Sequence, residues 1–192
     1  MLNDRTSPAT LLATRRSGRP RDMVAPGPSP TQLEAMIAIA ARTPDHGKLA
    51  PWRFVVVPAE ARDRLSDVIT TAYRAERPQA ARTEIDALDQ FAHQAPTLIV
   101  ALFSPRTESH IPIWEQQLSA GAACMNLLHA CHAMGFVGGW LTGWPTSSDA
   151  VRDAFGAAPE RIAGFMFVGS PSQDIEERVR PDLSKIMSIW GD

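Results

Sequence analysis

The run TLIVALF at residues 97–103 constrains the fold more than any other segment of this 192-residue chain. It has the length of a single strand, and it is apolar on both of the faces that a strand presents. We therefore predict that it forms a buried strand. A second short buried strand is predicted at residues 54–57, which Pro58 closes, and further strands are predicted at 136–140, where glycines weaken the strand, and at 162–169.

Helices are predicted between these strands. The clearest helix start has Ser29 as N-cap, Pro30 at the first helical position and Gln32 at the third, and Pro44 ends this helix. The other predicted helices cover residues 8–16, 59–76, 82–93, 114–134 and 149–155, and we expect 59–76 and 82–93 to lie mostly at the surface. Because strands and helices do not alternate strictly, the pattern favours an α+β fold, with helices flanking a small sheet, over a doubly wound fold.

Length and charge predict one domain, residues 1–192, without a nucleic-acid partner. A chain of this length can bury one good core and is small for two. The formal net charge is only −2, although Arg5, Arg15, Arg16, Arg19 and Arg21 crowd the first segment, which indicates a local anion site. No segment reaches the roughly 20 apolar residues of a membrane span, and no apolar region follows the N-terminal charges as in a secretory signal. We expect a cytoplasmic protein without a membrane partner.

Two cysteines lie in the predicted helix 114–134. Cys124 and Cys131 fall on roughly one face of it, about 10 Å apart along the axis, so a disulfide is not expected and a reducing compartment fits. His129 and His132 point elsewhere at helical spacing, and we therefore predict no metal site. Glu115, near the start of this helix, is interpreted as complementing the helix dipole.

Several segments could contact a ligand, although each also has a purely structural interpretation. Arg15, Arg16 and Ser17 could clamp a phosphate, or could end a helix whose C-terminus favours cations. Arg42 could contact a ligand or belong to the cationic last turn of a helix. His46 could contact a ligand or form a hydrogen bond with the backbone of its own loop. The tryptophan of PWRF at 51–54 could be a core aromatic residue. The glycines of GGWLTG at 138–143 could let a flat ligand approach the backbone, or could form a tight bend.

Together, and in this order, these segments resemble the nitroreductase family of FMN-dependent oxidoreductases, in particular its short single-domain branch. The resemblance runs from about residue 9 to residue 171 and includes the WEQ sequence at 114–116. It implies a set of cofactor-binding residues. The FMN phosphate is held by Arg15, Arg16 and Ser17, and the flavin is contacted by Arg42 and His46. The isoalloxazine ring lies against Gly139, Trp140, Leu141 and Thr142, and the nicotinamide contacts Ala130. Leu141 is apolar where members of this branch often have a polar residue. The tail after Pro171 matches poorly, and its Arg178 and Arg180 could add phosphate contacts.

The resemblance also implies a fold and a reaction. The fold is an α+β sandwich, with a central and mostly antiparallel sheet flanked by helices, in an intertwined homodimer with FMN at the interface. NAD(P)H gives a hydride to flavin N5, and the flavin passes electrons to a nitroaromatic, a quinone or a similar small molecule by a ping-pong mechanism. No catalytic side chain is predicted, because the flavin carries the chemistry. The alternatives are an FMN-binding protein without turnover and an FMN-dependent reductase or dehydrogenase of one metabolite. A small RNA-binding module would need a more basic chain.

Overall fold

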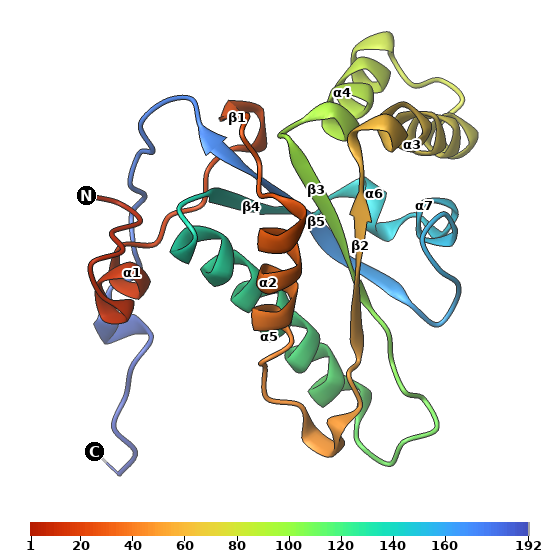
Figure 1. Ribbon diagram of the computed structural model, residues 1–192. Coiled ribbons are helices and arrows are strands. Elements are labelled where there is room, and N and C mark those ends of the chain that lie inside the picture. Colours follow the sequence, from red (N-terminus) through yellow and green to blue (C-terminus); the bar gives the residue numbers. More distant parts are fainter. Residues whose placement is uncertain (192) are drawn as a thin grey trace.

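The apolar run forms β3 (Thr97–Phe103), an inner strand of an antiparallel sheet, in a computed structural model that describes residues 1–191 (Figure 1). β3 pairs with β2 (Trp52–Val57) on one side and with β5 (Arg161–Pro171) on the other. The second edge of β5 pairs with β4 (Val137–Leu141) and with the short β1 (Met23–Val24). All of these described pairs are antiparallel, which confirms the predicted α+β sheet.

The inner strands supply two separate cores, because successive side chains of a strand point to opposite faces. Leu98 and Val100 belong to one core, and Ile99 and Ala101 belong to the other. The first core is covered by α3 (Arg62–Glu76) and α4 (Arg82–His93), and the second by α2 (Pro30–Ala40) and α5 (Ile113–Ala133) (Figure 1). The molecule is therefore a sandwich with the sheet in the middle.

Residues 59–76 and 82–93 expose many side chains, as predicted, yet each of the two helices also buries an apolar side that was not predicted. Leu65 and Ile69 of α3 and Ala92 of α4 are buried in the first core. Both helices carry many charges, yet their apolar residues recur at helical spacing and face the sheet. Residues 59–61 form a separate 3-10 turn (Ala59–Ala61) before α3.

The predicted helix starts and ends agree with the structure to different degrees. At the start of α2, the Ser29 hydroxyl accepts a hydrogen bond from the Gln32 amide, and the Gln32 side chain accepts one from the Ser29 amide. This capping box confirms the predicted start, but α2 ends at Ala40 rather than at Pro44. α1 (Pro8–Thr14) stops before Arg15, whose backbone has left the helical conformation. The helix therefore ends two residues before the predicted end at Arg16, with Arg15 as its C-cap and without a basic residue in its last turn.

Other short elements complete the chain. α6 (Trp144–Ser147) and the two-residue β1 were not predicted, and α7 (Asp149–Asp153) is shorter than expected. Further 3-10 turns lie at Pro20–Asp22, His46–Lys48 and Leu183–Lys185. Cys124 and Cys131 are free and buried in α5, and burial raises the pKa of Cys124 to about 12. Within residues 1–191, no helix is both long enough and apolar enough to span a membrane.

The tail after β5 folds back toward the beginning of the chain. The Ser172 amide donates to the Asp22 carbonyl, and the Arg16 side chain donates to the Glu176 carbonyl, 160 positions away in sequence. Figure 1 shows the tail running beside α1, so that the two ends of the chain lie on the same side of the molecule. Sequence periodicity gave no indication of this contact, because it depends on long-range hydrogen bonds.

Arg62 supports the junction between β2, α3 and α4. Its side chain is only 5% exposed and donates to the carbonyls of Val57 (3.2 Å), Ala92 (2.7 Å) and Gln94 (3.2 Å). We expect Arg62→Met to lower the free energy of unfolding by about 2–4 kcal/mol, because three carbonyl groups lose their donor. Urea denaturation followed by circular dichroism measures this change. The control is Arg64→Met, at an exposed position of the same helix, and an equal loss in both variants would contradict the assignment.

Candidate functional site

Two of the predicted ligand-contacting segments meet at the β4 side of the sheet. The Gly18 amide, which follows residues 15–17, donates to the Gly138 carbonyl of β4 at 3.3 Å. A Cβ atom at Gly139 would lie 2.9 Å from the Gly18 carbonyl oxygen, a distance that real Cβ atoms do not tolerate. Glycine at this position therefore permits the close approach of the two backbones. The structure places the predicted phosphate clamp directly beside the glycine-containing strand.

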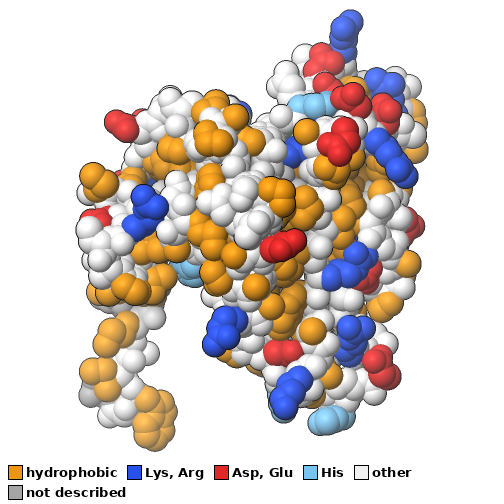
Figure 2. Space-filling view, in the orientation of Figure 1, with side chains coloured by type: hydrophobic (Ala, Val, Ile, Leu, Met, Phe, Trp, Pro, Cys, Tyr) orange, Lys and Arg blue, Asp and Glu red, His pale blue; other side chains and the backbone are white. Residues whose placement is uncertain are grey.

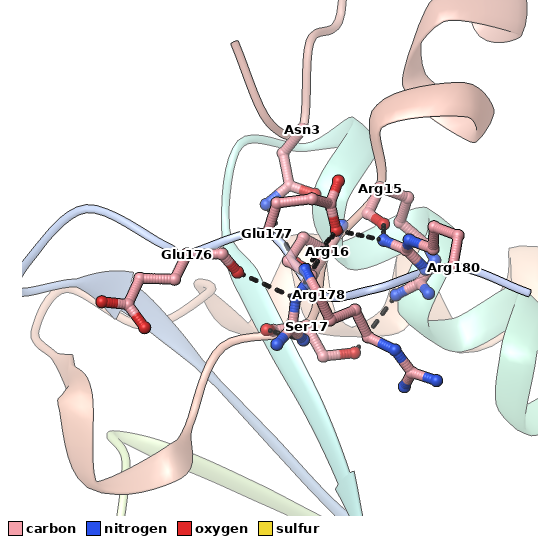
Figure 3. A network of polar contacts seen from close by, with 8 residues as sticks. All are labelled: Asn3, Arg15, Arg16, Ser17, Glu176, Glu177, Arg178 and Arg180. Carbon is pink, nitrogen blue, oxygen red and sulfur yellow. Dashed lines mark hydrogen bonds and ion pairs between the residues drawn. The ribbon is translucent and has the colours of Figure 1, made fainter.

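Four guanidinium groups gather at this place (Figure 3). Arg15 and Arg16 come from the beginning of the chain and Arg178 and Arg180 from the tail, and we call these four residues the arginine cluster. Arg15 donates to the Ser17 hydroxyl at 3.1 Å, and Arg180 donates to the Arg15 carbonyl at 3.2 Å. Burial, followed by the charges of Arg180, Arg16 and Arg178, lowers the pKa of Arg15. Arginine nevertheless stays protonated at neutral pH, so the cluster is a concentrated positive charge suited to an anion.

The backbone of Arg16 is fixed from both sides. The side chain of Asn3 accepts from the Arg16 amide at 2.8 Å and donates to the Arg16 carbonyl at 3.1 Å. The Arg16 guanidinium donates to the carbonyls of Glu176 and Ser17, both at 3.0 Å. These bonds replace the helical hydrogen bonds that residues 15–17 lack, and they hold the segment in an extended conformation.

A cavity of about 410 Å³ lies beside the arginine cluster. Arg16, Ser17 and Gly18 line it from one side, and tail residues 173–177 line it from the other. Four acidic residues, Asp22, Asp174, Glu176 and Glu177, also line this cavity, so its side-chain donors for an anion are Arg16, Arg19 and the Ser17 hydroxyl rather than the cavity wall as a whole.

Residues 140–142 differ in the surfaces that they present. Trp140 lies over Gly164 of the neighbouring strand, its indole N–H donates to the Ala163 carbonyl at 3.0 Å, and its ring remains partly exposed. Leu141 packs against the first core, and Thr142 is exposed. The contact of Leu141 with the core accounts for an apolar side chain at this position.

Arg42 and His46 lie in a loop that is attached to α5. The Ser119 hydroxyl donates to the Pro44 carbonyl at 2.6 Å, and the Asn126 amide group donates to the Arg42 carbonyl at 3.3 Å. The Asn126 amide group also lies 2.7 Å from the hydroxyl of the buried Thr43. Contacts along one face of the helix thereby fix the loop that contains Arg42 and His46.

The same face of α5 orients the imidazole of His46. Glu115 lies one helical turn before Ser119, and its carboxylate is 2.9 Å from His46 Nδ1. An ionised carboxylate only accepts hydrogen bonds, so His46 carries a proton on Nδ1 and presents Nε2 away from this contact. The interpretation of Glu115 as a helix-dipole partner missed this contact, because the two residues are 69 positions apart in sequence.

The loop with His46 and the arginine cluster lie at opposite ends of α5. Glu115 is in the first turn of the helix. Burial and, after it, the charge of Arg15 lower the pKa of His129, so Arg15 is close to this residue. His129 follows Glu115 by 129 − 115 = 14 residues. At 1.5 Å per residue this separation is about 21 Å along the helix axis. A single chain therefore does not bring all predicted flavin contacts into one place.

Two other predicted features of α5 are buried. Ala130 is 2% exposed in the second core, so the structure gives the predicted nicotinamide contact no open surface. His132 is fully buried and accepts from the Gly138 amide, and burial lowers its pKa to about 4. Within residues 1–191, no three His, Cys, Asp or Glu side chains gather as a metal ion would require.

Comparisons with known proteins agree on one family. A model described as "Nitroreductase family" matches residues 12–170. The chain is 37% identical, over 84% of its length and 86% of the relative, to "Putative NAD(P)H nitroreductase YdjA" of Escherichia coli strain K12. A nitroreductase-like protein from Bacillus cereus superposes over the whole of both chains with a TM-score of 0.81 and 20% identity. A "putative nitroreductase in complex with fmn" from Desulfovibrio desulfuricans superposes with a TM-score of 0.72 and 20% identity, over 94% of this chain and 95% of that one.

The attachment of the loop to α5 is testable by hydrogen exchange. We expect Ser119→Ala to speed amide exchange in residues 42–48 by about fivefold, because the lost hydrogen bond to Pro44 corresponds to about 1 kcal/mol. Exchange in the core strands should stay unchanged. The control is Gln117→Ala, at an exposed position of the same helix. Equal exchange in the two variants would show that Ser119 does not hold the loop.

Proposed function

Because this chain belongs to the nitroreductase family, we propose that it binds FMN and passes electrons from NAD(P)H to a small acceptor such as a nitroaromatic or a quinone. The observation that carries this proposal is the arginine cluster beside the glycine-containing β4. The name of the Escherichia coli relative supports an NAD(P)H-dependent reduction, and the Desulfovibrio structure with the same fold contains FMN.

The residues at this place fit the chemistry of FMN. A phosphate group takes up bidentate hydrogen bonds from guanidinium groups; the arginine cluster supplies four of them, and that of Arg15 donates to the Ser17 hydroxyl (Figure 3). A flat ring system needs an aromatic surface, which the partly exposed Trp140 provides on the adjacent strand, whereas Gly139 is buried against the Gly18 backbone. We propose that the backbone of Leu141 and the hydroxyl of Thr142 continue this surface.

In the proposed reaction, the bound FMN supplies the redox chemistry, since its ring can accept a hydride and later release electrons. The protein binds and orients. The arginine cluster and Ser17 hold the phosphate end, and the end of β4 supports the ring. His46 presents Nε2 away from Glu115, because the Glu115 carboxylate lies on the Nδ1 side of its imidazole. We propose no side chain as a nucleophile or as the group that transfers electrons.

The separation of the two groups of contacts is the reason for proposing a homodimer. If α5 packs antiparallel against the same helix of a second copy, the beginning of one helix lies beside the end of the other. His46 of the partner subunit would then approach the arginine cluster of the first chain. Each of the two cofactor sites would contain residues from both chains.

The exposed face of α5 supports this arrangement. Trp114 is 63% exposed and Leu118 is 62% exposed, and Gly121 continues the stripe at helical spacing. A Cβ atom at Gly121 would meet no described atom within 4 Å, so another helix has room to approach. The tail also exposes apolar side chains, including Ile186 and Trp190, and hydrophobic groups cover its protruding end in Figure 2.

An absorption spectrum of the purified protein, before and after anaerobic addition of NADH or NADPH, tests the proposed function. Flavin bands that disappear on reduction are the expected result. Bands that persist would favour an FMN-binding protein without this turnover. Absence of flavin even after incubation with FMN would overturn the proposal.

Removing the guanidinium of Arg180 should weaken binding of FMN but not of riboflavin. We expect Arg180→Met to raise the Kd for FMN about tenfold to a hundredfold, since a hydrogen bond to a charged group contributes about 1.5–3 kcal/mol. Riboflavin lacks the phosphate, so its Kd should change by less than about twofold. Fluorescence titration measures both values, with Arg21→Met as the control at an exposed arginine. Equal losses for both ligands would place the phosphate elsewhere.

A large side chain at Gly121 should block the dimer without harming the fold of the chain. We expect Gly121→Leu to elute as a monomer in size-exclusion chromatography with light scattering, at concentrations where the unchanged protein is a dimer. Its helix should not be weakened, because leucine favours helices more than glycine does and the site is open. Gly121→Ala is the small control and should stay dimeric. A dimeric Gly121→Leu protein would exclude this face from the interface.

A further inference from the structure

One carboxylate lies inside the arginine cluster. Glu177 Oε1 is 2.8 Å from the guanidinium of Arg180 and 4.0 Å from that of Arg16. The same oxygen accepts a hydrogen bond from the Arg178 amide at 2.8 Å, which lowers the pKa of Glu177 together with the bond from Arg180. One oxygen atom of Glu177 therefore receives the kind of donors that a phosphate oxygen would receive here.

Its neighbour Glu176 has a different role. The Glu176 carbonyl accepts from the Arg16 side chain, but Figure 3 shows its carboxylate pointing away from the cluster. Two adjacent glutamates thus carry the same charge, and only one of them places it among the guanidinium groups. This difference makes Glu176 a matched control for Glu177.

We propose that Glu177 is an internal counter-anion, which occupies part of the phosphate site while the site is free of FMN and is displaced when the FMN phosphate binds. The inference rests on the proposed FMN site. In this role Glu177 opposes binding of the phosphate. Glu177 belongs to the tail, so displacement of its carboxylate would also rearrange the tail near residues 176–180.

Charge is the physical reason for such a role. Four guanidinium groups at close range repel one another, and a carboxylate between them offsets part of that repulsion. A phosphate with a charge near −2 offsets more of it, but it also repels a carboxylate that stays in place. The Arg180 donor at 2.8 Å cannot bond fully to both anions. Binding of one anion therefore favours release of the other.

Displacement requires that Glu177 can move at low energetic cost. Its side chain is 49% exposed, and it lies in the irregular part of the tail between β5 and the 3-10 turn at Leu183–Lys185. No core packing has to be broken for the carboxylate to turn toward solvent. Ion pairs with this degree of exposure are weak, so a phosphate can exchange for the carboxylate.

The opposite role makes the opposite prediction. If Glu177 only held Arg16 and Arg180 in position, its removal would loosen the cluster and weaken FMN binding. If it competes with the phosphate, its removal strengthens FMN binding. The sign of the change distinguishes the two roles.

The test compares Glu177→Gln with Glu176→Gln by fluorescence titration with FMN and with riboflavin. At low salt we expect Glu177→Gln to lower the Kd for FMN about three- to tenfold and to leave the Kd for riboflavin unchanged. Glu176→Gln should change both values by less than about twofold. The increase in FMN affinity of Glu177→Gln should be smaller in 0.5 M NaCl, because salt screens exposed charges. An FMN affinity of Glu177→Gln that equals or falls below that of Glu176→Gln overturns the inference.

A second readout keeps this test independent of FMN binding. Inorganic phosphate should raise the melting temperature of Glu177→Gln more than that of Glu176→Gln, because the anion no longer competes with a carboxylate. If the unchanged protein binds no FMN but phosphate still raises the melting temperature of Glu177→Gln more, the proposed function is wrong and the role of Glu177 as a counter-anion is supported. If FMN binds but phosphate raises the melting temperature of both variants equally, the role of Glu177 as a counter-anion is wrong and the proposed function is supported.

Discussion

The structure depends on the need to cover both faces of one sheet. β3 and β5 carry buried side chains on each face, so a helical layer on one side only would leave a large apolar surface in water. α5 is the main cover of the second core, and its 21 residues make it the longest helix among residues 1–191. One side of α5 packs on the sheet, another holds the loop of residues 42–46, and a third exposes Trp114 and Leu118. Because α5 covers the second core, its length and position set the distance between the two groups of proposed flavin contacts.

The arginine cluster depends on a close approach of backbones. Glycines at positions 18 and 139 let the beginning of the chain lie against β4, and the tail then brings Arg178 and Arg180 to the same place. Such a concentration of like charge is unfavourable without an anion. The carboxylate of Glu177 and the carbonyls that accept from Arg16 offset part of this cost, while Asn3 holds the Arg16 backbone in place. The proposed cofactor would offset more of it through its phosphate.

Local signals in the sequence were sufficient for much of the fold. The capping box at Ser29 and the apolar run of β3 depend only on neighbouring residues, and both are confirmed. The apolar stripes by which α3 and α4 contact the sheet were not predicted, because many charged residues lie between the apolar ones. The end of α1 was placed too late, since the Asn3 bonds that hold Arg16 out of the helix come from 13 positions away. The resemblance to the family supplied what local patterns could not, the sandwich architecture and the candidate site.

The candidate site could be predicted only in part for the same reason. The proximity of residues 15–17 to Gly139 follows from long-range pairing, and so does the arrival of the tail arginines. The contact between Glu115 and His46 joins residues 69 positions apart, and the burial of Ala130 follows from which side of α5 meets the sheet.

A crystal structure of the protein with FMN bound would show whether each flavin site is shared between two chains. We expect two chains related by a two-fold axis, with the phosphate among the arginine cluster and Ser17 of one chain and with His46 of the partner subunit facing the same cofactor. A phosphate bound away from this cluster, or a complete flavin site within one isolated chain, would contradict this expectation.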